Sequence, residues 1–174
     1  GNKTGAIKER GVVHREGALH ATSHIWIVRK NEKSGCDILL QKRSACKDSH
    51  PGCYDISSAG HIGAGDEALE AALRELEEEL GIKAKPEELL ESGVQYKNYE
   101  GEFYGRPFRD NQRSILYLYK EPINMDELVL QESEIESVIW MDYKEALEAI
   151  RENTMKHCIY EEEFLKVGKA LGIE

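Results

Sequence analysis

Residues 60–82 read GHIGAGDEALEAALRELEEELGI, and this stretch decides the fold. After a loop with three glycines, four leucines recur at the spacing of one helical face, and Gly81 ends the predicted helix. Glu75, Glu78 and Glu79 stand at helical positions i, i+3 and i+4, so they share a second face. Each pair of like charges there costs about 0.2–0.5 kcal/mol, which a bound divalent cation would offset. Oxygen ligands of this kind suit Mg²⁺ or Mn²⁺.

A solvated acidic face above a leucine stripe is the simpler interpretation, because charged runs are common on exposed helix faces. The order of the residues argues against it. The stretch resembles the Nudix box, G-x5-E-x7-R-E-U-x-E-E-x-G-U, in which U is an aliphatic residue. The matching residues are Gly60, Arg74-Glu75-Leu76, Glu78-Glu79 and Gly81-Ile82. The first acid of the box is Asp66 instead of a glutamate, so the role of that position is open.

The Nudix resemblance implies a metal centre on this helix. It implies that Glu75, Glu78 and Glu79 bind Mg²⁺ or Mn²⁺, with help from the carbonyl group of Gly60. A physical argument supports the metal, because a diphosphate brings negative charge to an acidic site and cations must bridge the two. The metal would also polarise a phosphoryl oxygen and lower the pKa of the attacking water. The implied reaction is hydrolysis of the diphosphate bond in a nucleoside diphosphate linked to another moiety, or in a related organic diphosphate.

Arg74 and a general base complete the predicted catalytic set. Arg74 would orient the carboxylates through its guanidinium group. The alternative is a simple ion pair along the helix, but arginine before glutamate is the less favourable order for such a pair. The base is open between the box residues Glu75 and Glu78 and the loop acids Glu132 and Glu134. Glu134 is an equally good candidate for the base and for an exposed loop acid.

A narrower resemblance lies outside the box. The segments HREGALH, ILLQKRS, KDSHPG and YDISSAGH are similar to the isopentenyl-diphosphate isomerase branch of the Nudix superfamily, whose metal site uses three histidines and two glutamates. Its histidine positions fall on His14, His20 and His61, a candidate second metal site, with hydrogen-bonded structural histidines as the alternative. Its catalytic cysteine and glutamate positions are Ala59 and Gln112 here. Without that proton donor and acceptor we expect an isomerase-like scaffold that hydrolyses diphosphates.

Basic residues outside the box are candidates for contacts with the outer phosphates of a substrate. Arg43 ends a predicted strand near the box, and Lys47 lies in the loop that follows it. Arg109 and Arg113 lie in and directly after a glycine-rich and aromatic segment. For each of the four, the alternative is surface charge in a chain that must stay in solution.

Composition bounds the class of protein. The chain has 174 residues, enough for one domain with a hydrophobic core, and its hydrophobic share of 40% is ordinary for a globular protein. A formal net charge of −10 argues against nucleic acid as a partner, because no basic stripe is present. No apolar run approaches the length of a membrane span, so no membrane partner is expected.

Localisation and assembly are less constrained. The four cysteines include no C-x-x-C pair, so we expect reduced thiols in a cytoplasmic protein. No signal peptide is visible, although a chain that begins with glycine leaves a removed leader open. The expected partner is a small-molecule diphosphate, and a homodimer is not decided by the sequence.

The hydrophobic pattern predicts where strands and helices lie. Strands are expected at residues 21–30, 37–43, 53–58, 89–100, 113–120 and 137–141, and helices at 142–152 and 158–171. The strand at 21–30 is apolar on both sides, so we expect both of its faces to be covered. Residues 1–10 are predicted to be a frayed start or an edge strand.

Two further segments are predicted to lack regular structure: 12–20 is turn-rich around a glycine, and 101–111 is expected to be a loop. The pattern and the Nudix resemblance together imply a single α/β domain over 1–174. We expect an α/β/α sandwich with a mixed, curved central sheet, a core at about 12–150 and C-terminal helices within 142–171.

Overall fold

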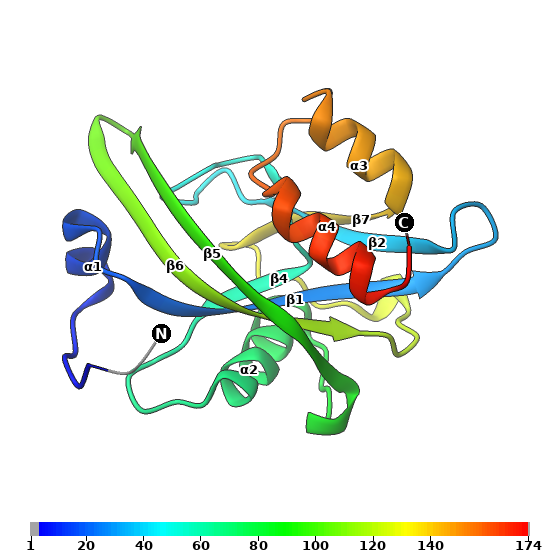
Figure 1. Ribbon diagram of the computed structural model, residues 1–174, viewed down its shortest axis with the longest axis horizontal. Helices are drawn as coiled ribbons and strands as arrows, with labels where there is room; N and C mark the ends of the chain where they lie inside the picture. Colours follow the sequence, from blue (N-terminus) through cyan, green and yellow to red (C-terminus); the bar gives the residue numbers. More distant parts are fainter. Residues whose placement is uncertain (1–3, 174) are drawn as a thin grey trace.

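A seven-stranded mixed sheet runs through residues 4–173, the part of the chain that the computed structural model describes (Figure 1). The strands are β1 (His20–Lys30), β2 (Cys36–Arg43), β3 (Tyr54–Asp55), β4 (Ser58–His61), β5 (Leu89–Phe103), β6 (Arg106–Tyr119) and β7 (Ile135–Asp142). The helices are α1 (Arg10–Glu16), α2 (Ala68–Leu80), α3 (Tyr143–Arg151) and α4 (Glu161–Ala170), with 3₁₀ turns at Pro86–Glu88 and Met125–Glu127. The strand order is β3-β2-β1-β6-β5, with β4 also paired to β1 and β7 to β2.

Strand β1 organises the sheet because three other strands pair with it. β6 runs parallel to it over residues 20–27, β4 antiparallel over 22–25 and β2 antiparallel over 28–30. The side chains of Trp26 and Val28 enter one hydrophobic core, and those of Ile25 and Ile27 enter a second core on the opposite face. The prediction that this strand is covered on both sides is therefore confirmed.

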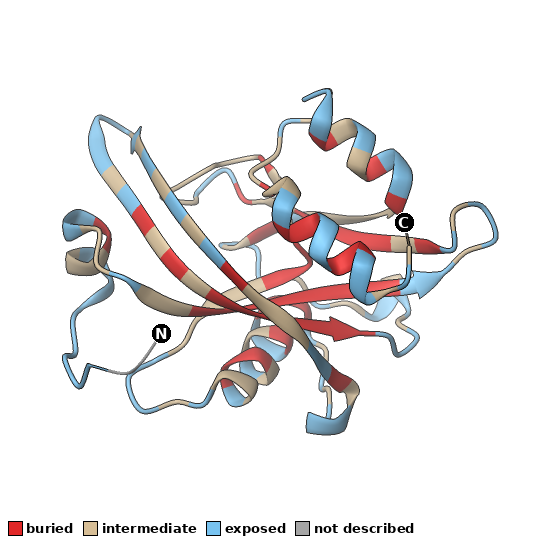
Figure 2. Cartoon of the chain, viewed as in Figure 1, coloured by how far each residue is buried: buried red, intermediate tan, exposed pale blue. Residues whose placement is uncertain are grey.

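Helices cover both faces of the sheet. α2 lies on one face, where its buried Leu76 and Leu80 join the core that contains Ile25 (Figures 1 and 2). α3 and α4 lie on the other face, where Phe164 and Val167 of α4 pack in the core that contains Trp26. The predicted α/β/α sandwich with a mixed sheet is confirmed. No helix within residues 4–173 is both long and apolar enough to cross a bilayer.

The expected loop at 101–111 is wrong, because these residues belong to a long twisted hairpin. Beyond a register shift between Glu91 and Gly93, β5 and β6 pair as far as Phe103 and Arg106, which leaves only Tyr104 and Gly105 as the turn. Both turn residues have positive φ, 52° and 74°, as a type I′ turn requires, and this turn matches the twist of the strands. The ring centroids of Phe103 and Phe108 lie 5.4 Å apart in an edge contact, so the aromatic residues stabilise the strand pair.

A short helix replaces the edge strand or turn expected near the N-terminus. α1 ends at Gly17, which has φ 68° and donates its N–H to the carbonyl oxygen of Val13. The helix is held by a contact far along the chain, since His14 Nδ1 lies 3.1 Å from the carbonyl oxygen of Arg109 on β6. Residues 1–3 of the predicted N-terminal segment lie outside the described residues.

The expected strand at 53–58 is two short strands, β3 and β4, that pair with different neighbours. β3 pairs with β2, whereas β4 pairs with β1. Between them the Ser57 hydroxyl bridges two strands, because Oγ donates to the carbonyl oxygen of Leu39 at 2.6 Å and accepts from the N–H of Ile27 at 2.8 Å. The chain therefore passes from the side of β2 to the side of β1 before it enters the loop that precedes α2.

Candidate active site

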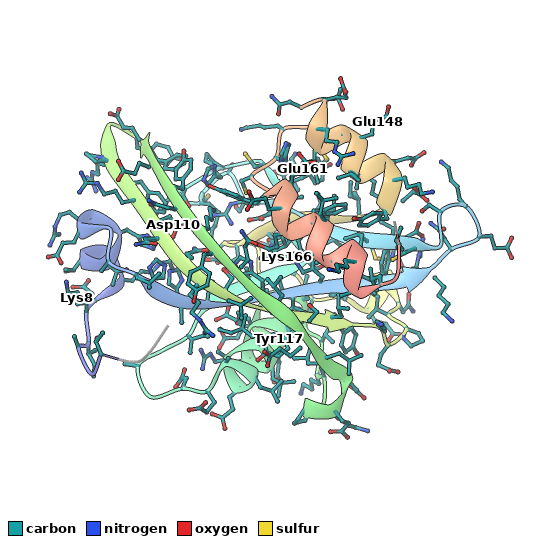
Figure 3. All side chains as sticks on the ribbon, in the orientation of Figure 1. Lys8, Asp110, Tyr117, Glu148, Glu161 and Lys166 are labelled. Atoms are coloured by element: carbon teal, nitrogen blue, oxygen red, sulfur yellow. The ribbon has the colours of Figure 1, made fainter. Side chains whose placement is uncertain are left out.

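A pocket with a volume of about 300 Å³ gathers residues from segments far apart in the chain. Its walls come from α1, β1, the 43–50 segment, β4, α2, β5, β6, residues 131–134 and residues 158–163. Asp110, one of the lining residues, lies on β6 where the β5–β6 hairpin passes between α1 and α4 (Figure 3). Most side chains that line the pocket are polar or charged.

The predicted acidic cluster of α2 faces this pocket. Glu75, Glu78 and Glu79 all line it, as does Gly60 of β4. Glycine is needed at that position, because a Cβ atom there would lie only 2.0 Å from Cδ of Glu75. The structure therefore brings together the four residues that the sequence proposes as metal ligands.

Burial changes the acidity of two of these carboxyl groups. Glu79 Oε2 accepts hydrogen bonds from Ser58 Oγ at 2.6 Å and from the backbone N–H of Ala59 at 3.3 Å. Burial raises the pKa of Glu79 to about 7. Burial, together with the charge of Glu78, also raises the pKa of Glu75. A divalent cation would favour the ionised form of both groups, so metal binding and proton release are coupled at this site.

Arg74 ties the unusual first position of the box to the helix. Its Nη1 donates to Asp66 Oδ2 at 2.8 Å, and its Nη2 lies 4.0 Å from Glu75 Oε1. Arg74 does not line the pocket. The aspartate side chain at position 66 is thus long enough to reach the arginine. Arg74 contacts the box carboxylate Glu75 and the loop carboxylate Asp66, so it can orient Glu75 from outside the pocket.

Of the two loop acids considered as the base, Glu134 lines the pocket and Glu132 does not. The carboxylate of Glu134 forms an ion pair with the ammonium group of Lys47, which lines the pocket as well. The connector after β6 reaches this place along the end of α2, where the N–H of Gln131 donates to the carbonyl oxygen of Glu79 at 3.0 Å. The Glu134 carboxylate and the Lys47 ammonium group thus line the same pocket as the α2 carboxylates.

His14, His20 and His61 come together in space, with one ring nitrogen of each within 4.8 Å of the others. Nδ1 of His14 lies 3.1 Å from the carbonyl oxygen of Arg109, and Nδ1 of His20 lies 3.0 Å from that of Ala18. A ring nitrogen beside a carbonyl oxygen carries the proton, so Nε2 of both rings keeps its lone pair. Backbone carbonyl groups orient metal-binding histidines in this way.

Asp110 adds a carboxylate to the three histidines. Its Oδ1 lies 3.4 Å from His20 Nε2, and neither of these buried atoms has a hydrogen-bond partner among residues 4–173. A cation or a shared proton between these two atoms would supply the partner that both lack. Burial lowers the pKa of His61 to about 3 and also lowers that of His14, so both rings stay neutral, as metal ligation requires. The donor set fits a divalent cation.

The basic residues predicted to meet substrate phosphates divide into two pairs. Arg43 and Lys47 line the pocket, but the structure does not bring Arg109 and Arg113 to it. Successive side chains of a strand point to opposite faces, and Asp110 and Gln112 are the residues of β6 between them that line the pocket.

Arg43 is already occupied by protein partners. Its Nη2 donates to the carbonyl oxygen of Ser49 at 2.9 Å, and its Nη1 donates to Asp55 Oδ2 at 3.1 Å. The guanidinium group therefore braces the loop after β2 against β3. Lys47, in that loop, pairs with Glu134, and its positive charge acts on the Glu75 and Glu79 carboxyl groups of the box helix.

Sequence reasoning missed several polar residues of the pocket, namely Arg10, His24, Asp55, Lys97 and Glu163. Lys97 is well buried, with Nζ 3.5 Å from Asp110 Oδ2 and 4.6 Å from the centre of the Tyr160 ring. A lysine in the inward phase of a strand is the signal that could have found it. For Arg10 and Glu163 no local signal exists, because separate helices carry them to the pocket.

Comparison with known proteins gives a consistent result. A family model described as the NUDIX domain matches residues 19–161. Nudix hydrolase 3 of Arabidopsis thaliana is 42% identical over 149 residues, which are 83% of this chain and 18% of that protein. An uncharacterized Nudix hydrolase of Clostridium acetobutylicum is 36% identical over 138 residues, which are 79% of this chain and 64% of that protein. The chain thus spans less than two thirds of the length of either relative.

Solved structures share the fold. The NUDIX domain of Shewanella oneidensis NrtR, complexed with ADP ribose, aligns with a TM-score of 0.64 at 14% identity, over 88% of this chain and 89% of that one. The stretch matched by the family model excludes α1 and nearly all of α4. Arg10, His14 and Glu163 are therefore pocket residues that lie outside the matched stretch.

Proposed function

The chain belongs to the Nudix family, and from this premise we propose that it hydrolyses an organic diphosphate with the help of a divalent metal ion, Mg²⁺ or Mn²⁺. The substrate is a nucleoside diphosphate linked to another moiety, or a related organic diphosphate. One observation carries the proposal: the three carboxylates of α2 meet Gly60 in a single pocket that also holds cationic side chains.

The α2 residues would hold the metal. Glu75, Glu78 and Glu79 offer carboxylate oxygens, and Gly60 offers its carbonyl oxygen. A metal bound there would polarise the phosphoryl oxygen and make the attacking water more acidic. Arg74 would keep the Glu75 carboxylate in place, because its guanidinium group lies between Glu75 and Asp66 and pairs with both carboxylates.

Glu134 is our candidate for the general base that takes a proton from the attacking water. Its carboxylate lies in the pocket and is paired with the ammonium group of Lys47. Lys47 would then be freed to meet a substrate phosphate when the proton arrives on Glu134. Glu75 and Glu78 are the alternatives, because they line the same pocket.

A second cation site is part of the proposal. The Nε2 lone pairs of His14 and His20, the ring of His61 and the unpartnered Oδ1 of Asp110 form a donor set of the kind that binds Mn²⁺ or Zn²⁺ more readily than Mg²⁺. A cation there would add positive charge to the pocket that receives the diphosphate.

The isomerisation of a prenyl diphosphate is the second candidate function. The convergence of the three histidines favours it, since the isomerase resemblance implies this cluster. The two positions that would supply its proton donor and acceptor, Ala59 and Gln112, both line the pocket but carry no acidic group. Isopentenyl diphosphate incubated in deuterated water separates the two functions, because only isomerisation places solvent deuterium in the product.

Phosphate release from a panel of diphosphates, with and without Mg²⁺, tests hydrolysis directly. The panel contains nucleoside diphosphate sugars, dinucleotides and prenyl diphosphates. Glu78→Gln should abolish release, whereas Glu77→Gln should not, because Glu77 is exposed on α2 and faces Lys83 outside the pocket. Equal activity in the two variants would reject the metal assignment.

A further inference from the structure

A second pocket, with a volume of about 550 Å³, lies at the end of the sheet where β1 turns into β2. It shares no residue with the candidate active site. His20 of the histidine cluster begins β1 and Lys30 of the second pocket ends it, so about 33 Å of strand lies between them. Figure 1 shows the two ends, with α1 beside one and the end of α4 beside the other. The hydrolysis described above uses nothing in this second pocket.

Three lysines from different elements surround this space, and we call it the lysine pocket. Lys30 ends β1, Lys120 directly follows β6, and Lys144 lies in the first turn of α3. Within residues 4–173, none of their ammonium groups has a hydrogen bond or an ion pair with a protein group. By contrast, Lys33, in the turn between β1 and β2, is paired with Glu145 of α3.

The sheet places two of these lysines on the face that α3 and α4 cover. Val28 packs in the core of that face, so Lys30, two residues further along β1, points to the same side. Leu118 of β6 packs in the same core, so Lys120, two residues after it, points to that side as well. Lys144 adds its charge from α3 above this face. The three side chains therefore converge on one space.

The floor of the lysine pocket is apolar. Val28 and Cys36 are 3% and 4% exposed, and Leu171 and Ile173 pack against the same core. Cys36 adds no charge, because burial raises the pKa of its thiol to about 11. A charged ligand would therefore keep its charge at the lysines, and an organic group attached to it would cover the floor.

Neighbouring groups of the protein do not use the charge of these lysines. Asp37 and Asp142 both act on the Cys36 thiol, but each has another partner. Arg29 Nε donates to Asp37 Oδ2 at 2.8 Å, and Ser34 Oγ donates to Asp142 Oδ2 at 2.6 Å. The carbonyl groups in the last turn of α4 need no lysine either, because the N–H groups of residues 171–173 donate to them. Three unpaired cations thus gather in a chain whose formal net charge is −10.

We propose that the lysine pocket binds an oligophosphate anion. An ammonium group binds phosphate as a point charge, and three of them match an anion with about three negative charges. A single phosphate group carries only about 1.5–2 charges near neutral pH. The apolar floor admits an organic group, so inorganic and nucleoside oligophosphates share the chemistry that this site recognises. The box carboxylates lie in the other pocket, so the anion is bound here and not hydrolysed.

The test is calorimetry with inorganic triphosphate in EDTA and about 0.15 M salt. EDTA removes the cations that would bridge a phosphate to the α2 carboxylates, so binding at the active site is suppressed. A combined variant with glutamine at all three lysines of the pocket should raise Kd at least about tenfold. The control has the same net charge and carries glutamine at three exposed lysines outside both pockets, Lys8, Lys83 and Lys85. Its Kd should stay within about twofold of that of the unmodified chain.

Backbone amide resonances of three glycines locate the bound anion. Gly35 and Gly172 line the lysine pocket, and Gly60 lines the active site. Triphosphate should shift the resonances of Gly35 and Gly172 and leave that of Gly60 in place. Adenosine triphosphate in the same titration separates the two sources of the anion. Binding at least about fivefold tighter than that of triphosphate shows that an organic group covers the apolar floor, whereas equal binding shows that the phosphate chain alone is recognised. Both results support the pocket.

Four outcomes overturn the proposal. They are no binding of triphosphate, a shift of the Gly60 resonance alone, an equal Kd in the unmodified chain and the lysine-pocket variant, and an equal loss in both combined variants. The last would show only a general attraction to positive charge. Lys144→Gln alone should raise Kd about threefold, and this exposed single variant gives the same test if the combined variant fails to fold. No outcome depends on the proposed hydrolysis, because every measurement is made without metal.

Discussion

Cδ of Glu75 lies 2.0 Å from the place that a Cβ atom would take at Gly60, so strand β4 and the box helix touch at the carboxylate itself. Gly60 has an ordinary backbone conformation, since its φ is not among the positive values of the chain. The glycine is required for space and not for flexibility.

Replacing this glycine should separate activity from stability. Gly60→Ala would push the flexible end of Glu75 away, so we expect weaker Mg²⁺ binding and at least about a tenfold loss in kcat/KM, with little change in the free energy of unfolding. The control is Gly11→Ala, where the added Cβ would lie 4.0 Å from the nearest atom. Full activity in Gly60→Ala would contradict the role given to Glu75.

The three histidines should bind a second metal ion. We expect calorimetry with Mn²⁺ to give two sites in the unmodified chain and one in His61→Gln, because that ring completes the cluster. His157→Gln is the matched control, since His157 lies outside both the cluster and the pocket. If the His61→Gln variant still binds two Mn²⁺ ions, the three histidines are structural residues and do not form a metal site.

The pair of Glu134 and Lys47 offers a test of the general base. If Glu134 takes the proton, Glu134→Gln should lower kcat about 10²- to 10⁴-fold with little change in KM. Lys47→Met should act mainly on KM, because it removes a cation that would meet the substrate. Similar small effects from both variants would return the role of base to Glu75 or Glu78.

Acid should weaken the fold in part through the cap of α3. Asp142 Oδ1 accepts hydrogen bonds from the N–H groups of Lys144 at 3.0 Å and Glu145 at 3.3 Å. The hydrogen bond from Ser34, with those from Asn31 and the α3 backbone, lowers the pKa of Asp142 to about 2. Its folded-state pKa lies below the usual value of ~3.9, so it stabilises the fold fully above about pH 5, and this contribution is lost as the pH falls toward 2.

Two variants test that cap. Asp142→Ala should lower the free energy of unfolding at neutral pH by about 0.5–2 kcal/mol, and Asp142→Asn by less, because asparagine can still cap a helix. Denaturant unfolding at pH 7 and at pH 3 measures both effects. The asparagine variant should lose less stability between the two pH values than the unmodified chain; an equal loss would assign the acid sensitivity to other carboxylates.

The box helix and the strands around it could be predicted because their signals are local. The leucine period places α2, Gly81 ends it, and the double-sided apolar pattern of 21–30 marks the strand shared by both cores. The hairpin at 101–111 could not be found in this way, since its glycines and arginines are typical of a loop, whereas only Tyr104 and Gly105 form the turn. These residues form strands because β5 and β6 pair with each other, and that pairing leaves no local signal in the sequence.

The candidate site divides in the same manner. The α2 carboxylates were found because the box fixes their spacing, and the histidines because a narrower resemblance fixed theirs. Glu163 and His24 meet across 139 positions of sequence, and α1 is a seven-residue helix held by contacts with β6. Neither leaves a periodic signal, because tertiary packing and not local preference decides both.

An anomalous difference map from crystals grown with Mn²⁺ and a diphosphate product tests the central claim most directly. The account predicts a peak in the pocket coordinated by the carboxylates of Glu75, Glu78 and Glu79, with a product phosphate oxygen on the same ion. A map in which these side chains coordinate no ion, while the product is held elsewhere, would contradict it.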